Sequence, residues 1–368
     1  MKSQSISVST VLEKAAIFAL ILTSQASASS VVRAWGYNRD WNGNVVNQSV
    51  VPSGLYDAAG IAAGAYYSVA VDASGQLRGW GENDWGQLTF PTDVGVISKL
   101  RAGVGFAGVV RNDGTIRLWG QNDFGQCNPP NGIGAVVDLS LGWWHAIAIQ
   151  TDGSLVAWGR NDAGQTTVPP NLGSLVGIGA GARFCVACRT NGTVAAWGSN
   201  TNWNGQYSGQ SVVPTGLTNV AQVAAGYAFA LALRGNGTVT AWGDSGAGET
   251  SVPANLSNVT AIAAGASHAL ALRSDGNVVA WGLNNFNQCS VPTGTRATKI
   301  AAGWFHSIAV SDCLGDINDD GQVNGADLGG LLAFWGPDPS YPRADLNGDG
   351  VVNGADLGLL LSNWGACR

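Results

Sequence analysis

A short pattern of apolar and polar positions recurs along most of the chain, and residues 261–282 show it clearly. An apolar run ends in Ala264-Gly265, and a second run alternates two sets of side chains up to Arg273. Asp275-Gly276 follows, and a third run ends in Trp281-Gly282. Alternating runs joined by Asp-Gly are typical of β-hairpins, because both central residues of the tight turn need positive φ. The unit therefore predicts three antiparallel strands.

This unit repeats seven times with little change in length. The glycine of the Trp-Gly pair recurs at positions 36, 81, 120, 159, 198, 243 and 282. The glycine that ends the first run recurs at positions 64, 103, 142, 181, 226, 265 and 303. Each complete unit has 17 residues from the first glycine to the second, as from Gly64 to Gly81, whereas the joint after Trp-Gly varies in length. Such a period indicates one supersecondary unit that packs against its copies.

The two ends of the repeat region complement each other. Residues 31–36 form a lone third strand, and residues 300–310 form a first and second strand without a third. An open array would leave both as exposed edges, whereas pairing them closes a ring. We therefore expect an all-β, seven-bladed β-propeller with N-terminal strand closure over residues 29–311. A proline in each joint, such as Pro169, favours three strands per blade and an irregular outer segment.

Residues 1–28 have the features of a secretory signal peptide. Lys2 and Lys14 precede the apolar run 15–22, and Ala26-Ser27-Ala28 forms a cleavage site of small residues. The run is too short to span a bilayer, and no other segment approaches that length. The alternative is a buried N-terminal helix. We expect a protein without a membrane span that is secreted or held at the cell surface.

Charge divides the remaining chain into two parts. Residues 29–311 contain 14 Lys+Arg and 14 Asp+Glu, whereas residues 312–368 contain 9 Asp and 2 Arg, a net charge of −7. Nucleic-acid recognition depends heavily on neutralising phosphates. A neutral propeller therefore predicts no nucleic-acid partner.

The acidic segment carries two calcium-loop motifs spaced 29 residues apart. The side chains and backbone at alternate loop positions are the expected ligands, with glycine at position 6 and a carboxylate at position 12. These positions are Asp316, Asn318, Asp320, Gln322, Asn324 and Asp327 in one loop and Asp345, Asn347, Asp349, Val351, Asn353 and Asp356 in the other. Each loop continues into a short apolar helix. We expect a small α-helical C-terminal domain, residues 312–368, with two EF-hand-like loops that bind two calcium ions as its cofactors.

Six cysteines fall into two classes. Cys313 and Cys367 bracket the acidic domain, and exported proteins can keep disulfides, so we expect these two to pair. Cys127 and Cys289 share one register in different blades, and Cys185 and Cys188 lie at odd spacing on one strand. We interpret these four as small buried residues.

Over residues 31–311 the repeats resemble the family of the regulator of chromosome condensation, whose signature ends in W-G-x-N-x-x-G-Q. Asn83 to Gln87 and Asn122 to Gln126 carry that signature. The short period is similar to the compact secreted proteins of the β-lactamase inhibitory protein type II kind. This resemblance implies the propeller fold, whereas function differs among members, which include exchange factors, inhibitors, light receptors and scaffolds.

The acidic segment resembles a dockerin module over residues 315–365. Dockerins are calcium-dependent domains that bind cohesins in extracellular enzyme complexes. Loop positions 10 and 11 are Gly325-Ala326 and Gly354-Ala355, where classical dockerins carry a Ser/Thr-type pair that contacts the cohesin. This departure leaves the calcium assignment intact and makes a cohesin partner doubtful.

Three histidines invite a catalytic or metal-binding interpretation. His145, His268 and His306 all lie three residues after the repeated glycine, where the other blades have Tyr67, Phe106, Phe184 and Phe229. A position that alternates between histidine and other aromatic residues indicates packing, with the imidazole bonded to a neighbouring backbone group.

Two function classes follow from these features. Two joints are six residues longer than the others and place Trp41 and Trp203 in matching Trp-Asn-Gly segments. Binding residues concentrate on loops held by a rigid scaffold, so both tryptophans are expected to be exposed and to contact a partner; the alternative is that both loops merely pack. The first class is a non-catalytic binding or scaffold protein with an extracellular protein or polysaccharide as its partner. The second is a secreted carbohydrate-active enzyme, although no acid/base pair breaks the repeat.

Overall fold

The structure, a computed structural model, describes residues 30–53, 55, 58–293, 295–313, 315–318, 322–337, 344–347 and 350–366. The chain divides into two compact units, of which one extends from Ser30 to Leu314 and the other from Gly315 to Cys367. The predicted signal peptide, residues 1–28, lies outside the described residues.

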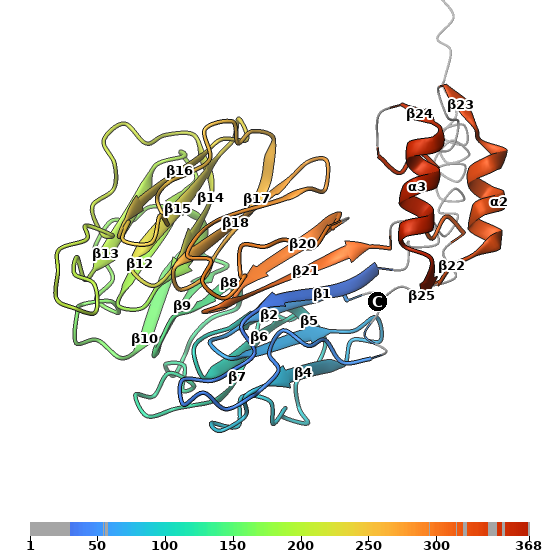
Figure 1. The fold of residues 1–368 in the computed structure, drawn as a ribbon. Helices are drawn as coiled ribbons and strands as arrows, with labels where there is room; N and C mark the ends of the chain where they lie inside the picture. The colour runs from blue at the N-terminus through green and yellow to red at the C-terminus, as the bar shows by residue number, and fades with distance from the viewer. Residues whose placement is uncertain are drawn as a thin grey trace, which may run out of the picture. The chain divides into compact units, whose positions relative to one another are not determined.

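The first unit consists of repeated three-stranded antiparallel sheets (Figure 1), seven of them within the described residues. Six sheets are formed by consecutive strands: β2 (Gly60–Ala63), β3 (Tyr67–Val71) and β4 (Leu77–Gly81); β5 (Ile97–Ala102), β6 (Phe106–Arg111) and β7 (Ile116–Gly120); β8 (Val136–Leu141), β9 (His145–Gln150) and β10 (Leu155–Gly159); β11 (Leu175–Ala180), β12 (Phe184–Arg189) and β13 (Val194–Gly198); β14 (Val220–Ala225), β15 (Phe229–Arg234) and β16 (Val239–Gly243); β17 (Val259–Ala264), β18 (His268–Arg273) and β19 (Val278–Gly282). The described parts of the joints between sheets contain no named strand, as their prolines predict.

The seventh sheet joins the two ends of the repeat region. It has the order β1 (Ser30–Gly36), β21 (His306–Asp312) and β20 (Ala297–Ala302). β1 runs antiparallel to β21, with Gly36 opposite His306, in the same register in which Gly81 of β4 lies opposite Tyr67 of β3. β1 thus takes the place of the third strand that residues 300–312 lack.

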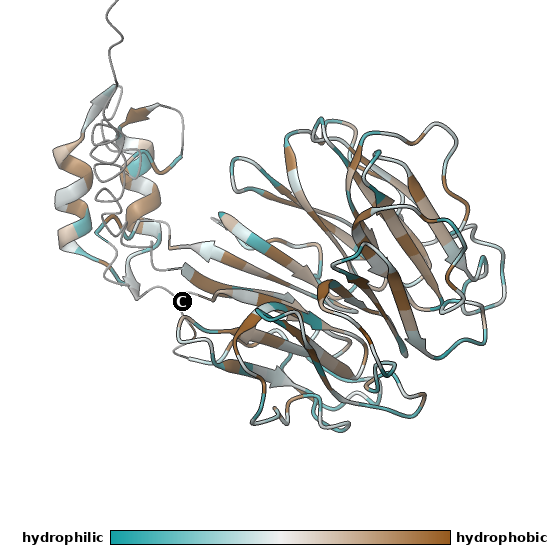
Figure 2. Cartoon of the chain, turned by 180° about the vertical axis from the view of Figure 1, so that it is seen from behind, coloured by the Kyte–Doolittle hydropathy of each residue, from teal (hydrophilic) through white to brown (hydrophobic). Residues whose placement is uncertain are grey.

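Apolar side chains fill the space between neighbouring sheets, and Figure 2 shows hydrophobic residues along the strands. The second strand of each complete sheet is almost entirely buried, as the pattern of β15 illustrates. Each repeated tryptophan is buried and donates its indole N–H to a backbone carbonyl in a joint. Trp80 bonds the Gln48 carbonyl at 2.9 Å, and Trp35 bonds that of Gln288 at 2.9 Å. Large aromatics supply most of the burial here, while the hydrogen bond satisfies the indole nitrogen.

The repeated glycine is required because neighbouring sheets approach closely there. A Cβ at Gly303 would overlap the ring of His306 and the carbonyl oxygen of Gly64. Backbone bonds cross between sheets at the same level: Trp143 N–H donates to Gly181 at 3.3 Å, and Trp304 N–H donates to Gly64 at 3.2 Å. The second bond connects the sheet of β20 to the sheet of β2.

The three histidines are buried packing residues that bond a side chain of the neighbouring sheet. The Nε2 atoms of His306 and His268 lie 2.9 Å from the hydroxyls of Ser68 and Ser307, respectively. Nε2 of His145 lies 3.2 Å from Sγ of Cys185. Where the register position holds Tyr or Phe, the neighbouring sheet has an alanine at the place of the serine or cysteine: Ala107, Ala146, Ala230 and Ala269. The histidines therefore pack as the repeat predicts, and the residue that each one contacts in the next sheet changes together with it.

The cysteines differ from expectation in one respect. Cys127, Cys185, Cys188 and Cys289 are free. Cys185 and Cys188 are fully buried and pack in different hydrophobic clusters, as their odd spacing predicts. Cys127 and Cys289 are only half-buried, because each lies in a joint, where its thiol donates to a backbone carbonyl.

The second unit contains two similar helix-containing halves. α2 (Gly325–Ala333) and α3 (Gly354–Ser362) are N-capped by Asn324 and Asn353, and each has a capping box completed by an aspartate. β22 (Gln322–Val323) pairs with β25 (Gly365–Ala366), and β23 (Gly336–Pro337) pairs with β24 (Val351–Val352), so each half bonds the other. Val323, Leu331, Val352 and Leu360 are fully buried and form a small core.

Candidate ligand-binding site

The two long joints fold alike and present their tryptophans to solvent. Asp40 N–H donates to the Asn44 carbonyl at 2.9 Å, and Asn202 N–H donates to that of Gln206 at 2.9 Å, so each joint forms a small turn. Trp41 is 79% exposed and Trp203 is 65% exposed, as the sequence predicts. Whether they bind a partner stays a prediction.

Both tryptophans line one pocket of about 720 Å³. Its walls come from three kinds of segment: the long joints, the loop after β4 and the turns that join the first and second strands of the sheets. The lining residues are Trp41, Asn42, Ala65, Tyr66, Glu82, Asp84, Trp85, Val104, Gly105, Trp143, Trp144, Trp203, Tyr227, Ala266, Ser267, Trp304 and Phe305. Pockets of this size suit small ligands or short segments of a polymer.

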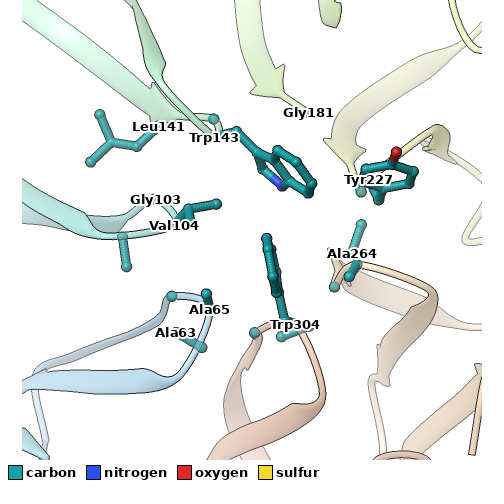
Figure 3. Close-up of a pocket in the computed structure, with 18 of the residues that line it drawn as sticks. Ala63, Ala65, Gly103, Val104, Leu141, Trp143, Gly181, Tyr227, Ala264 and Trp304 are labelled. Atoms are coloured by element: carbon teal, nitrogen blue, oxygen red, sulfur yellow. The ribbon is translucent and has the colours of Figure 1, made fainter. Parts of the chain in front are cut away.

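The floor of the pocket is formed by six of the seven residues that directly follow the repeated glycine, all except Ala182. This position holds Ala65, Val104, Trp143, Ala182, Tyr227, Ala266 and Trp304 in the seven sheets. Its three large aromatics point toward one another over a narrow central opening (Figure 3), which residues of all seven sheets line. The cavity at this opening has a volume of about 70 Å³, which is enough for a few water molecules.

Trp143 connects this floor to the rim. Its ring centroid lies 4.9 Å from that of Trp304, 5.0 Å from that of Tyr227 and 5.6 Å from that of Trp203 in the long joint. Tyr66 extends the cluster, 5.4 Å from Trp304. Sequence reasoning missed these floor residues, although a signal was present: the repeat has small residues at this position in four units and large aromatics in three.

The charged groups of the pocket are acidic. Of the described residues that line it, Glu82 and Asp84 carry charge. Burial, with the charges of Asp84 and Asp40 adding to it, raises the pKa of Glu82 to about 7. Asp40 itself is partly desolvated, but hydrogen bonds from Asn44 outweigh that effect and lower its pKa. Glu82 accepts a long hydrogen bond of 3.4 Å from the Gln87 amide.

A cation already stacks on an aromatic ring next to the pocket. The guanidinium carbon of Arg160 lies 4.8 Å from the ring centroid of Trp144 and 5.0 Å from that of Phe124. Arg160 also forms a 2.7 Å ion pair with Asp162. Arg160 and Glu82 occupy the same position after Trp-Gly in different repeats, so one repeat position carries opposite charges in two repeats.

The predicted calcium ligands lie in the loops before α2 and α3, and part of each set is outside the described residues. Asp320 and Asp349 are not described, and among the described residues no group of three or more His, Cys, Asp or Glu gathers at one metal site. Asp316 and Asp327 are buried in the first loop. Asp345 accepts the Gly350 N–H at 2.8 Å, a bond that turns the second loop. The described Asp and Asn oxygens are of the type that calcium prefers.

Other described positions of the two loops already have protein partners. Asp327 accepts the backbone N–H of Ile317 at 2.7 Å, and Asp356 accepts that of Asn353 at 2.8 Å. The side-chain oxygens of Asn324 and Asn353 accept backbone N–H groups, and the Asn353 amide donates to the Val351 carbonyl. Interactions with other protein groups are also present at Asn318, Gln322 and Asn347. The calcium assignment stays a prediction.

Cys313 is disulfide-bonded. Cys367, its predicted partner, lies outside the described residues.

Comparison with known proteins identifies the repeat. The profile of the "Regulator of chromosome condensation (RCC1) repeat" matches residues 59–87, 136–165, 220–249 and 259–288. The chain carries an RCC1-like β-propeller. Solved structures of this architecture include human WBSCR16, at 18% identity and a TM-score of 0.62, covering 77% of this chain and 99% of that one.

Two further propellers are similar in fold. Prp20p from Saccharomyces cerevisiae has 16% identity and a TM-score of 0.66, covering 80% of this chain and 94% of that one. The ectodomain of the Arabidopsis thaliana receptor kinase ACR4 has 19% identity and a TM-score of 0.57, covering 69% and 93%. No curated protein sequence gives a significant match. These likenesses concern the fold, since functions differ within it.

None of the described helices is long and apolar enough to cross a membrane.

Proposed function

We propose that this protein is an exported, non-catalytic binding protein whose seven blades form a ring closed by β1 and whose aromatic pocket holds an extracellular protein or polysaccharide. The acidic C-terminal unit serves as a calcium-dependent attachment or assembly device. A signal peptide at residues 1–28, a dockerin-like duplication and the neutral charge of residues 29–311 support this function together.

One observation carries the proposal: the exposed Trp41 and Trp203 line the same aromatic pocket. Exposed aromatic groups on a rigid frame are typical anchors for partners, because they bury a large area and lose little conformational entropy. The repeated sheets hold their joints by backbone hydrogen bonds, so the anchors are preorganised. A merely structural tryptophan would be covered by its own protein.

The test uses the double variant Trp41→Ala/Trp203→Ala and a panel of soluble extracellular polysaccharides, read by affinity electrophoresis and by release of reducing ends. We expect the variant to lose at least tenfold in affinity for the polysaccharide that the wild type binds, with a nearly unchanged melting temperature. Tyr207→Ala is the matched control, because Tyr207 is 74% exposed in the same joint as Trp203 and does not line the pocket.

Two results would change the conclusion. Unchanged binding in the double variant, or a large loss of stability, would assign both tryptophans to packing. Release of reducing ends that Glu82→Gln abolishes would favour the carbohydrate-active enzyme, because Glu82 is the one lining carboxyl whose pKa of about 7 would suit a general acid.

The calcium proposal rests on donor chemistry. Asp316, Asn318 and Asp327 would hold one ion together with Asp320, and Asp345, Asn347 and Asp356 would hold the second together with Asp349. Calcium would neutralise the carboxylates of each loop and fix the loop against its helix. Extracellular calcium would then decide whether the attachment unit is folded.

A further inference from the structure

The lining of the aromatic pocket restricts the chemistry of its ligand. Its surface is mainly aromatic and its two charged lining groups, Glu82 and Asp84, are both acidic. Asp40 lies close enough to add to the negative potential at Glu82, which also interacts with Tyr66 and with Gln87 of its own loop. The pocket therefore combines flat apolar faces with excess negative charge.

We propose that the pocket recognises a protonated amino sugar within an extracellular polysaccharide, with the sugar ring stacked on tryptophan and its ammonium group bonded to Glu82 and Asp84. This inference rests on the proposed function, because it names the ligand class of the same pocket. Three further observations on this face of the propeller support it.

The first observation concerns hydrogen-bond capacity. The carboxylate of Glu82 is half-buried, and the bond from Gln87 is long at 3.4 Å. A primary ammonium donates three hydrogen bonds and brings a positive charge, so it favours the ionised form of Glu82, whose pKa is otherwise about 7, and offsets the negative charges of Asp84 and Asp40. A quaternary ammonium cannot donate, and a neutral sugar brings no charge.

The second observation concerns the aromatic walls. Trp41 and Trp203 lie at the rim, while Trp143 and Trp304 form the floor, so flat faces stand at two depths. A cavity of about 720 Å³ holds more than one sugar ring, and the apolar faces of such rings suit aromatic platforms. A single lysine side chain would leave most of this volume empty.

The third observation is that a cation of the protein already contacts an aromatic ring and a carboxylate near this pocket. Arg160 stacks on Trp144, a lining residue, at 4.8 Å and pairs with Asp162. One cation thus engages an aromatic ring and a carboxylate on this face. The Glu82 side of the same pocket provides both partners, and of the described lining residues none supplies a cation.

The experiment compares two oligosaccharides of equal length and linkage, a glucosamine tetramer and a glucose tetramer, by titration calorimetry with the full chain at pH 6.5. We expect the glucosamine tetramer to bind at least tenfold more tightly, and added salt to weaken it selectively. The double variant Glu82→Gln/Asp84→Asn should reduce this preference to about twofold or less. Asp123→Asn is the matched control, because Asp123 is the equivalent of Asp84 in the next loop and does not line the pocket.

The outcomes separate the ligand class from the proposed function. Equal affinity for both tetramers, with loss of both in Trp41→Ala/Trp203→Ala, would overturn the amino sugar and leave the binding pocket in place. Preferential binding of a lysine-rich peptide over the glucosamine tetramer would also overturn it, in favour of a basic protein partner. Tetramer binding that is unaffected by the tryptophan substitutions would overturn both proposals.

Discussion

Single residues in this propeller change in pairs across the boundary between blades. His306 and Ser68 lie in different sheets, as do His268 and Ser307, and each pair is joined by a 2.9 Å hydrogen bond. Where phenylalanine replaces histidine, alanine replaces the serine in the next blade. A buried imidazole without that partner would leave its Nε2 unsatisfied, which costs about 1–3 kcal/mol. At these boundaries the residue after the register position of one blade therefore matches the residue at the register position of its neighbour.

Stability at acidic pH is predicted to depend on these histidines. Burial lowers the pKa of His306 to about 3, with His268 adding to the effect, and lowers that of His268 to about 4. The folded form keeps both neutral, whereas the unfolded chain binds protons below about pH 6.5, so stability is complete above that pH and is lost as pH falls toward 4. His306→Phe should reduce the loss in unfolding free energy between pH 7 and pH 5 by about 2 kcal/mol.

Denaturant titrations at the two pH values measure this difference. His268→Phe should act similarly, and Ser307 would keep its 2.8 Å bond to the Gln288 carbonyl. Tyr67→Phe, at the same register position, should leave the pH dependence unchanged because tyrosine does not titrate in this range. An equal pH dependence in His306→Phe and the wild type would show that protonation of these histidines does not limit acid stability.

Glu82 is predicted to have the opposite effect on stability. Its pKa of about 7 exceeds the ordinary value near 4.5, so the folded state holds a proton that the unfolded chain releases. Stability contributed by this proton is present below pH 4.5 and decreases as pH rises to 7. Glu82→Gln should therefore raise the free energy of unfolding at pH 8 but not at pH 4, by less than the ~3 kcal/mol of the full shift because the carboxyl is partly solvated. No difference at pH 8 would show that solvent screens Glu82 fully.

Some residues of the pocket could be predicted from the sequence and others could not, for a physical reason. Trp41 and Trp203 could be found because they lie in insertions that break a constant spacing. Trp143 and Trp304 lie 161 residues apart, each in a hairpin whose length does not vary, so no insertion marks them. Only the arrangement of the sheets brings their rings to 4.9 Å. Glu82 could not be distinguished from other charged residues of the repeat until the pocket around it was known.

At the level of elements, β1 replaces a missing strand. Val31, Val32 and Trp35 on this strand are buried, and all seven of its residues have partners on β21. The complementary ends of the sequence predicted this pairing without knowledge of the sheets. By contrast, the paired turns of the long joints depend on hydrogen bonds of Asp40 and Asn202 that a sequence pattern does not fix.

Deleting residues 31–36 should destabilise the propeller strongly. Removing three buried side chains, each contributing about 2 kcal/mol, should lower the melting temperature by about 10 °C. A synthetic peptide of residues 30–36 added in trans should restore part of the loss, which distinguishes a missing strand from general damage. A melting temperature within a degree or two of that of the intact chain would contradict closure by β1.

On the scale of the whole molecule, the chain combines a neutral propeller with an acidic segment. The net charge of −7 on residues 312–368 repels itself until cations neutralise it. The RCC1-like repeats and the second unit differ in net charge, so calcium should affect them differently. The sequence predicts the motif for the second unit, whereas the structure describes only part of its ligand sets.

We predict that the full chain binds two calcium ions. Calorimetry should give a stoichiometry of two, and Asp316→Asn and Asp345→Asn should each remove one equivalent. Asp123→Asn in the propeller is the control and should retain both. An unchanged stoichiometry in either loop variant, or no heat of binding in the wild type, would contradict the assignment.

The same region is predicted to be closed by a Cys313–Cys367 disulfide. The loop of 54 residues would gain roughly 4 kcal/mol from reduced chain entropy in the unfolded state. Peptide mapping of secreted, non-reduced protein should find the linked peptide. A linkage of Cys313 to any other cysteine would refute the pairing.

The residue after each repeated glycine has a consequence for how such proteins can diversify. The glycine and the aromatic ring three positions later pack between neighbouring sheets, whereas in six of the seven sheets the residue directly after the glycine lines the aromatic pocket. These six positions, at 65, 104, 143, 227, 266 and 304, could therefore vary in evolution or in a designed library, with 143, 227 and 304 varying together because their rings are in contact. Point substitutions at these positions, without any change in loop length, would be enough to alter which ligand the aromatic pocket accepts.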